Sequence, residues 1–296
     1  MKVSRFDLLL LTMVAIWGAN FSLVKVAMRD FPELAFNAFR LVIASAIFLS
    51  ALWWRRRPRD GATVAEPVLT RADWARLAFL GLVGHLMYQF LFLGGVKRTS
   101  VGNGSLIMGT TPVVVALLTA WTGHERVPPL RWLGAAISFT GLYIVVGQKV
   151  DWSASGHLGD FLVLGSVVCW ATYSVASVPL LRTHSPLVVT GYSISIGATL
   201  YVLAALPTLV GVAWASISLF SWALMGASAV FALALAYLIW YTSVQRVGST
   251  RTAAWSNVTP VIAMIIAAVW LGEPITISQV IGSLAIFTGL FITRRA

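Results

Sequence analysis

Residues 252–271, TAAWSNVTPVIAMIIAAVWL, form a run of 20 residues without a charged side chain. An α-helix needs about 20 predominantly apolar residues to cross the hydrocarbon core of a lipid bilayer. This stretch therefore predicts a transmembrane helix, and runs of the same kind elsewhere in the chain predict further ones.

The composition of the whole chain agrees with this stretch. Of the 296 residues, 58% are hydrophobic and only 10% are charged, and the mean hydropathy is +0.85. Soluble domains carry about 25% charged residues, and so few charges could not cover a surface that faces water. The sequence predicts an integral membrane protein whose surroundings are the lipid bilayer.

Similar uncharged runs define nine further candidate helices, so the expected fold is all-α with ten transmembrane helices. The ten expected spans cover residues 6–28, 33–54, 76–96, 101–121, 130–147, 158–181, 187–211, 219–243, 252–271 and 276–293. A transmembrane β-barrel would instead show short segments with alternating apolar residues. The first run lacks a small-residue cleavage site, so we expect a retained helix rather than a signal peptide.

The positive charges predict how these helices are oriented. With a cytoplasmic N-terminus, 15 of the 21 Lys and Arg residues fall on the cytoplasmic side and four on the outer side, while Lys25 and Arg40 lie within helices. Such an excess is the usual pattern on the cytoplasmic side. The net charge of +11 thus reflects topology and indicates no nucleic-acid partner. We expect both termini in the cytoplasm and a multi-pass location in a bacterial cytoplasmic (inner) membrane.

The chain contains two similar halves. The matched positions are Asp7 and Trp17 with Asp160 and Trp170, 153 residues later, and the TPV segment at 111–113 with the TPV segment at 259–261, 148 residues later. The halves are 1–150 and 151–296, each with five expected helices. Because five is an odd number, the second repeat must be inverted in the membrane. Inverted repeats are typical of secondary transporters, whose site lies near the midplane between the halves.

Several segments of both halves carry a family resemblance. They read WGANFSLVKVAM (17–28), FR (39–40), FLFLGGVKRTSVGNGSLIMGTTPVVVALLTAW (90–121) and YLIWYTSVQRVGSTRTAAWSNVTPVIAMIIAAVWLGEP (237–274). The chain resembles the EamA-type permeases of the drug/metabolite transporter superfamily over nearly its whole length, and among them it is most similar to the aromatic amino acid exporters. The resemblance implies a secondary transporter that exports small amphipathic metabolites, most of all neutral and aromatic amino acids. Transport would proceed by alternating access through a central cavity between the repeats.

Aromatic and polar side chains that share helix faces within the spans are the candidates for lining this cavity. They are Trp17, Asn20 and Lys25 on the first helix, His85, Tyr88 and Gln89 on the third, Trp170 and Tyr173 on the sixth, Tyr237 and Trp240 on the eighth, and Trp255 and Asn257 on the ninth. The alternative is that such residues serve helix packing or an interfacial belt. Pro112 and Pro260 lie mid-helix at matched positions, where each removes a backbone hydrogen bond and predicts a kink for gating.

Two cations fall within expected spans, where a charge is unfavourable unless it has a partner. For Lys25, attraction of a substrate carboxylate and snorkelling to the outer interface are both open. For Arg40 we favour a structural charge that snorkels or pairs with Asp30 or Glu33. No acid is expected near the midplane, which favours a zwitterionic or anionic substrate over a lipophilic cation. His85, which titrates near neutral pH, is either a proton site or a packing residue.

No residue pattern indicates catalysis. The four histidines are scattered without the spacing of metal ligands, and Cys169 has no nearby base. We therefore expect no catalytic residue, cofactor or metal, and a small-molecule substrate as the partner of a monomer or weak homo-oligomer. Export of drugs or of another metabolite stays open, and an integral membrane enzyme or an ion channel is the alternative of another class.

Overall fold

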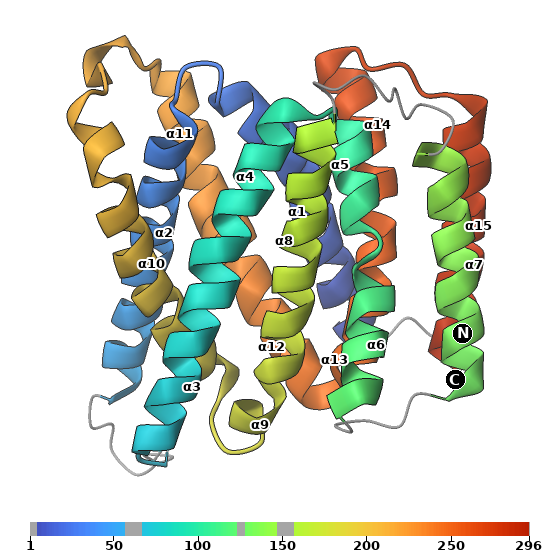
Figure 1. The fold of residues 1–296 in the computed structure, drawn as a ribbon, viewed down its shortest axis with the longest axis horizontal. Helices are drawn as coiled ribbons and strands as arrows, with labels where there is room; N and C mark the ends of the chain where they lie inside the picture. Colours follow the sequence, from blue (N-terminus) through green and yellow to red (C-terminus); the bar gives the residue numbers. More distant parts are fainter. Residues whose placement is uncertain (1–4, 57–66, 123–127, 147–156, 296) are drawn as a thin grey trace.

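The computed structural model describes residues 5–56, 67–122, 128–146 and 157–295, and every regular element in these ranges is helical (Figure 1). Within these described ranges, eight helical stretches are long and apolar enough to cross a membrane. They are Asp7–Ala27, Glu33–Arg55, Arg71–Arg98, Val101–Thr122, Leu158–Leu181, Pro186–Val210, Leu219–Val247 and Ser249–Leu271. These stretches correspond to eight of the ten expected spans.

Two further helices, α7 (Pro129–Val146) and α15 (Ile277–Arg295), lie side by side at one edge of the molecule (Figure 1). They occupy the places of the fifth and tenth expected spans, but the eight membrane-crossing stretches do not include them. That these two helices also cross the membrane stays a prediction.

The two repeats are built from similar successions of spans, with a few short extra turns in the second. The first contains α1 (Arg5–Ala27), α2 (Glu33–Arg56), a third span formed by α3 (Arg71–Gly81), η1 (Leu82–Met87) and α4 (Tyr88–Arg98), and a fourth formed by α5 (Val101–Met108) and α6 (Thr111–Thr122). The second contains α8 (His157–Ala176), α9 (Val178–Leu181), α10 (Pro186–Val210) and η2 (Trp214–Ser216), then α11 (Leu219–Ala227), η3 (Ser228–Leu235) and α12 (Ala236–Val247), and finally α13 (Ser249–Trp255), η4 (Ser256–Val258) and α14 (Thr259–Leu271). Both η1 and η3 are π-helical turns in the third span of their repeat.

The fourth span of each repeat is interrupted just before a matched proline. Proline has no N–H with which to close the preceding turn, so α5 ends at Met108 and α6 begins beside Pro112. The 3-10 turn η4 takes the corresponding place before Pro260. The hydroxyl of Thr111 donates to the Met108 carbonyl at 2.6 Å, which satisfies an acceptor at the break. The prolines thus interrupt their helices, and their use as gating pivots stays a prediction.

The two repeats interlock. α1 packs against α14, η3 and α12, while α8 packs against α4, α5 and α6, so the first helix of each repeat lies against the third and fourth spans of the other. The end of α1 lies near the start of α8, and Thr99 links the two helices. Lys25 Nζ donates to the Thr99 carbonyl at 2.6 Å, and the Thr99 hydroxyl donates to Asp160 at 2.6 Å. The two first helices therefore run in opposite directions, as inverted repeats require.

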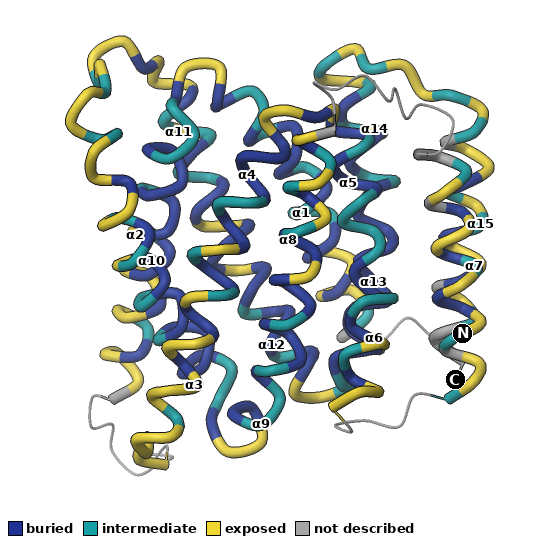
Figure 2. The backbone as a smooth tube through the Cα atoms, in the orientation of Figure 1, coloured by how far each residue is buried: buried dark blue, intermediate teal, exposed yellow. Residues whose placement is uncertain are grey.

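Exposed positions lie along the outside of the helices (Figure 2). Many of the exposed side chains are large and hydrophobic, and they include Leu8, Trp53, Leu203, Val269 and Leu284. An apolar surface of this extent is unfavourable in water and suits contact with lipid. Polar side chains are instead buried among the helices, where the cavity lies.

Candidate substrate cavity

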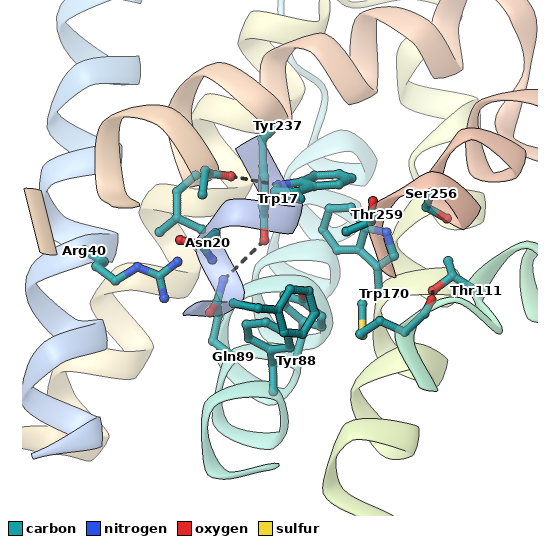
Figure 3. Close-up of a pocket in the computed structure, with 15 residues that line it drawn as sticks. Trp17, Asn20, Arg40, Tyr88, Gln89, Thr111, Trp170, Tyr237, Ser256 and Thr259 are labelled. Carbon is teal, nitrogen blue, oxygen red and sulfur yellow. Dashed lines mark hydrogen bonds between the residues drawn. The ribbon is translucent and has the colours of Figure 1, made fainter. Parts of the chain in front are cut away.

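A cavity lies between the repeats, with walls from both of them (Figure 3). Its volume, about 50 Å³, has room for only a few water molecules. The lining residues are Trp17, Asn20, Phe21, Arg40, Tyr88, Gln89, Phe92, Met108, Thr111, Trp170, Ala232, Leu233, Tyr237, Ser256 and Thr259. A mostly apolar and aromatic wall with a few polar groups is typical of sites for small molecules.

Two side chains of α1 are held by the π-helical turn η3. Trp17 Nε1 donates to the Ala232 carbonyl at 3.1 Å, and Asn20 Oδ1 accepts a hydrogen bond from the Ser228 hydroxyl. π-Helical turns interrupt the regular α-helical ladder and are frequent at functional sites. These bonds fix the first helix of one repeat to the third span of the other at the cavity wall.

The repeats also meet at a pair of equivalent residues. Gln89 and Tyr237 lie 148 residues apart, the same interval that separates the two TPV segments. Gln89 Nε2 donates to the Tyr237 hydroxyl at 3.2 Å, a bond drawn in Figure 3. Gln89 Oε1 is buried without a hydrogen-bond partner in the described chain. This oxygen is therefore available to a donor on a bound solute.

Trp170 lies at the centre of an aromatic cluster in the wall. Its ring centroid lies 5.6 Å from that of Trp17, 5.2 Å from that of Tyr88 and 5.0 Å from that of Tyr237. Tyr88 in turn stacks on Phe92, with 5.5 Å between the ring centroids. Such rings pack well against apolar and aromatic groups, and their faces attract cations.

Arg40 is the one charged side chain among the described residues of the wall. Its side chain is almost fully buried, with 1% of the residue exposed. Nη1 donates to Asn37 Oδ1 one helical turn earlier at 3.1 Å, and the guanidinium carbon lies 5.2 Å from the centre of the Phe36 ring. Nε has no hydrogen-bond partner in the described chain.

The two acids expected to pair with Arg40 are engaged elsewhere. Glu33 lies 3.4 Å from Lys97 and 3.3 Å from Arg98. Asp30 accepts hydrogen bonds of 2.6 Å from two serine hydroxyls at the start of α11, and these bonds hold its pKa below the usual value. Within the described ranges Arg40 therefore has no carboxylate partner, so the pairing with Asp30 or Glu33, one of the two structural explanations that the sequence offered, is not seen.

Lys25 faces a different space. Its Nζ donates to the Thr99 carbonyl, and it does not line the central cavity. It belongs to a second pocket of about 350 Å³, whose other lining residues are Met28, Arg29, Lys97, Leu271 and Glu273. Of the two cations within expected spans, the structure thus brings Arg40 to the cavity and leaves Lys25 outside it.

Three more predicted residues belong to a packed group beside the cavity, here named the inner cluster. It consists of His85, Tyr173, Ser193, Trp240 and Tyr241, all fully buried. His85 Nε2 lies 2.9 Å from the Tyr173 hydroxyl, which lies 2.8 Å from Ser193 Oγ. Tyr241 packs against Tyr173, with 5.0 Å between the ring centroids, and Trp240 packs against Trp170 of the wall, with 5.3 Å between the ring centroids. In this conformation none of these five side chains is among the lining residues of the cavity.

The wall thus contains half of the residues that the sequence proposed for it. Present are Trp17, Asn20, Tyr88, Gln89, Trp170 and Tyr237, and not among the lining residues are Lys25, His85, Tyr173, Trp240, Trp255 and Asn257. Thr111 and Thr259 line the cavity without having been predicted from the sequence, although they directly precede the matched prolines, whose breaks expose polar groups. In the part of the chain that the structure describes, no three His, Cys, Asp or Glu side chains are grouped to hold a metal ion.

Comparisons with known proteins place the chain in a family. The sequence profile of the EamA-like transporter family matches residues 4–147 and 157–295. The uncharacterized transporter YyaM of Bacillus subtilis (strain 168) is 30% identical, over 98% of this chain and 93% of its own length. A protein of Streptantibioticus cattleyicolor named a probable terminal-alkyne amino-acid exporter is 28% identical, over 100% of this chain and 95% of its own.

The fold is also similar to one already solved. A crystal structure with 20% sequence identity superimposes with a TM-score of 0.74, over 99% of this chain and 98% of the other. At this identity the similarity concerns the fold alone. The two profile matches agree with two repeats, and the relatives carry the names of transporters. The chain therefore belongs to the EamA-like transporter family, within the drug/metabolite transporter superfamily, and is a multi-pass membrane transporter.

Proposed function

We propose that this transporter exports small amphipathic metabolites, most of all neutral and aromatic amino acids, through the cavity between its repeats. The composition of the wall carries the proposal: aromatic rings from both repeats surround two side-chain amides and one buried cation, and no acid is among the described lining residues. An amino acid offers an apolar side chain to the rings, and a carboxylate and an ammonium group to the polar side chains.

One relative supports the same substrate class. The S. cattleyicolor protein that aligns over the whole chain is named an amino-acid exporter. The preference for aromatic amino acids rests on the rings of the wall, of which Trp17, Tyr88, Trp170 and Tyr237 come from four different helices.

Transport by alternating access fits the size of the cavity. A volume of about 50 Å³ is too small for an aromatic amino acid, so the walls must separate before a substrate can bind. The matched proline breaks and π-helical turns supply places where helix segments can pivot. Inverted repeats can exchange their conformations, which opens the cavity first to one side of the membrane and then to the other.

We propose the same orientation of the helices in the membrane that the distribution of positive charges predicts. In it, α7 and α15 also span the bilayer, and both termini lie in the cytoplasm of a cell whose inner membrane holds the protein. The ends of α2 and α12 and the start of α3, which carry Arg55, Arg246 and Arg71, lie at the same end of the molecule (Figure 1). Basic residues at one end are what a cytoplasmic side requires.

Export of drugs or of a different metabolite is the second candidate. A lipophilic cationic drug would meet the positive charge of Arg40 and no acid among the described lining residues. Exporters of cations commonly need an intramembrane carboxylate, so the wall favours a zwitterion or an anion. A membrane enzyme is less consistent with relatives that are named transporters.

The direct test uses purified protein in liposomes that are loaded with one radiolabelled amino acid at a time. We expect efflux of phenylalanine and tryptophan well above that from protein-free liposomes. Efflux without a pH gradient would indicate facilitated export, whereas efflux only under a gradient would favour His85 as a proton site. If folded protein released no amino acid at all, the proposed substrate class would be wrong.

A further inference from the structure

We propose that Arg40 is the residue that binds the substrate carboxylate, so that the transporter selects amphipathic solutes by their acid group. This inference rests on the proposed transport function and adds the recognition chemistry to it. It also replaces the purely structural role that the sequence favoured for Arg40.

The first observation is a buried cation at the wall of the cavity without a counter-charge. Arg40 is 1% exposed, and no carboxylate of the described residues lies within ion-pair distance of it. Among the described residues, its side-chain hydrogen bond goes to a neutral amide, Asn37, and its Nε has no partner. A charge buried in this way is strongly unfavourable until an anion neutralises it.

The second observation is the geometry that a guanidinium offers. Its planar array of N–H donors matches the two oxygens of a carboxylate, and such paired, charge-assisted hydrogen bonds are stronger than neutral ones. Asn37 occupies Nη1, whereas Nε remains without a partner in the described part of the chain. A carboxylate that entered the cavity would supply both the missing acceptor and the missing charge.

The third observation is the placement of the other polar groups. Figure 3 shows Arg40, Asn20 and Gln89 toward one end of the cavity, and Trp170 with Thr111 and Ser256 toward the other. Gln89 Oε1 lacks a partner and can accept from an ammonium group, and the nearby ring faces attract a cation as well. An amino acid would thus bind with its carboxylate on Arg40, its ammonium near Gln89 and its side chain among the rings.

The test compares phenylalanine with phenylethylamine, which has the same ring and ammonium group but no carboxylate. Proteoliposomes of the wild-type protein should release phenylalanine about 10- to 100-fold faster than phenylethylamine at equal low concentrations, since a hydrogen-bonded charge is lost with the carboxylate. In Arg40→Gln this ratio should fall to near one, and in Arg40→Lys it should be intermediate, because lysine keeps the charge but not the paired donors.

Lys25→Gln is the matched control, because it also removes one cation from an expected span, but one that lines the second pocket and not the cavity. Its substrate ratio should stay at the wild-type value. A purely structural Arg40 would change the rates of both solutes in parallel and leave their ratio unchanged, which would overturn the proposal.

The wild-type protein alone also decides the matter, should Arg40→Gln fail to fold. Equal release of phenylalanine and phenylethylamine by the wild type would refute carboxylate selection while leaving the transport function intact. Release of neither solute would instead contradict the proposed transport function, and the proposed role of Arg40 would fail with it.

Discussion

Gln89 and Tyr237 occupy equivalent places in the two repeats, and a hydrogen bond of 3.2 Å joins them. In an apolar wall an unpaired amide N–H or hydroxyl is unfavourable, and this bond pairs one with the other. It uses the nitrogen of Gln89 and leaves the amide oxygen without a partner among the described residues. One pair of side chains thus joins the repeats and presents a hydrogen-bond acceptor where they meet.

Tyr237→Phe removes this bond while keeping the ring. We expect KM for phenylalanine efflux to rise about 2- to 10-fold, the range for one lost hydrogen bond, because the Gln89 amide is no longer held in one orientation. Tyr143→Phe is the control, since Tyr143 is exposed on α7, at the edge of the molecule, and is not among the lining residues (Figure 1). An unchanged KM in Tyr237→Phe would show that the bond does not position Gln89 for substrate.

Helix periodicity found the residues of the wall better than it found their roles. It grouped Trp17 with Asn20 and Tyr88 with Gln89, and the structure places all four at the cavity. The sequence favoured a role in substrate binding more for Lys25 than for Arg40, whereas Arg40 lines the cavity and Lys25 does not. Periodicity identifies the face of a helix, but the neighbour of that face and the direction of a long side chain depend on the whole fold.

At the scale of elements, irregular turns recur at matched places in both repeats. The breaks before Pro112 and Pro260 were predictable, because proline cannot close a helical turn. The π-helical turns η1 and η3 were not, since no residue type specifies them. Close helix contact surrounds η1: Gly84 lets the ring of Tyr173 approach the backbone more closely than any side chain would allow.

Gly84→Ala tests this close contact. The added Cβ would overlap the ring of Tyr173, whose hydroxyl is already held by His85 and Ser193. Overpacking of this kind typically costs about 1–3 kcal/mol, so we expect a lower Tm in detergent and slower efflux. Gly226→Ala in α11 is the matched control, because its added Cβ meets nothing within 4 Å and its Tm should stay unchanged. The same Tm in both variants would mean that the side chains of the inner cluster shift to accommodate the added methyl group at little cost in stability.

At the scale of the whole molecule, the cavity exists only because the repeats interlock. The sequence predicted two inverted halves from the matched segments and the odd number of spans. It could not predict that α1 lies against the third and fourth spans of the other repeat, since this contact joins residues more than 200 positions apart, as between Trp17 and Ala232. Neither half can therefore enclose the cavity alone, and substrate bound there would contact both.

Binding between the repeats is tested most directly by a cysteine in the cavity wall. In a Cys169→Ala background, Ser256→Cys places a thiol in the wall, and its labelling by a water-soluble thiol reagent is followed in proteoliposomes. Ser216→Cys, in the exposed turn η2, serves as the control whose labelling should not respond to substrate. We predict that phenylalanine slows the labelling of Ser256→Cys several-fold and that phenylethylamine does not. Labelling that is equally fast with and without phenylalanine would contradict a substrate site in this cavity.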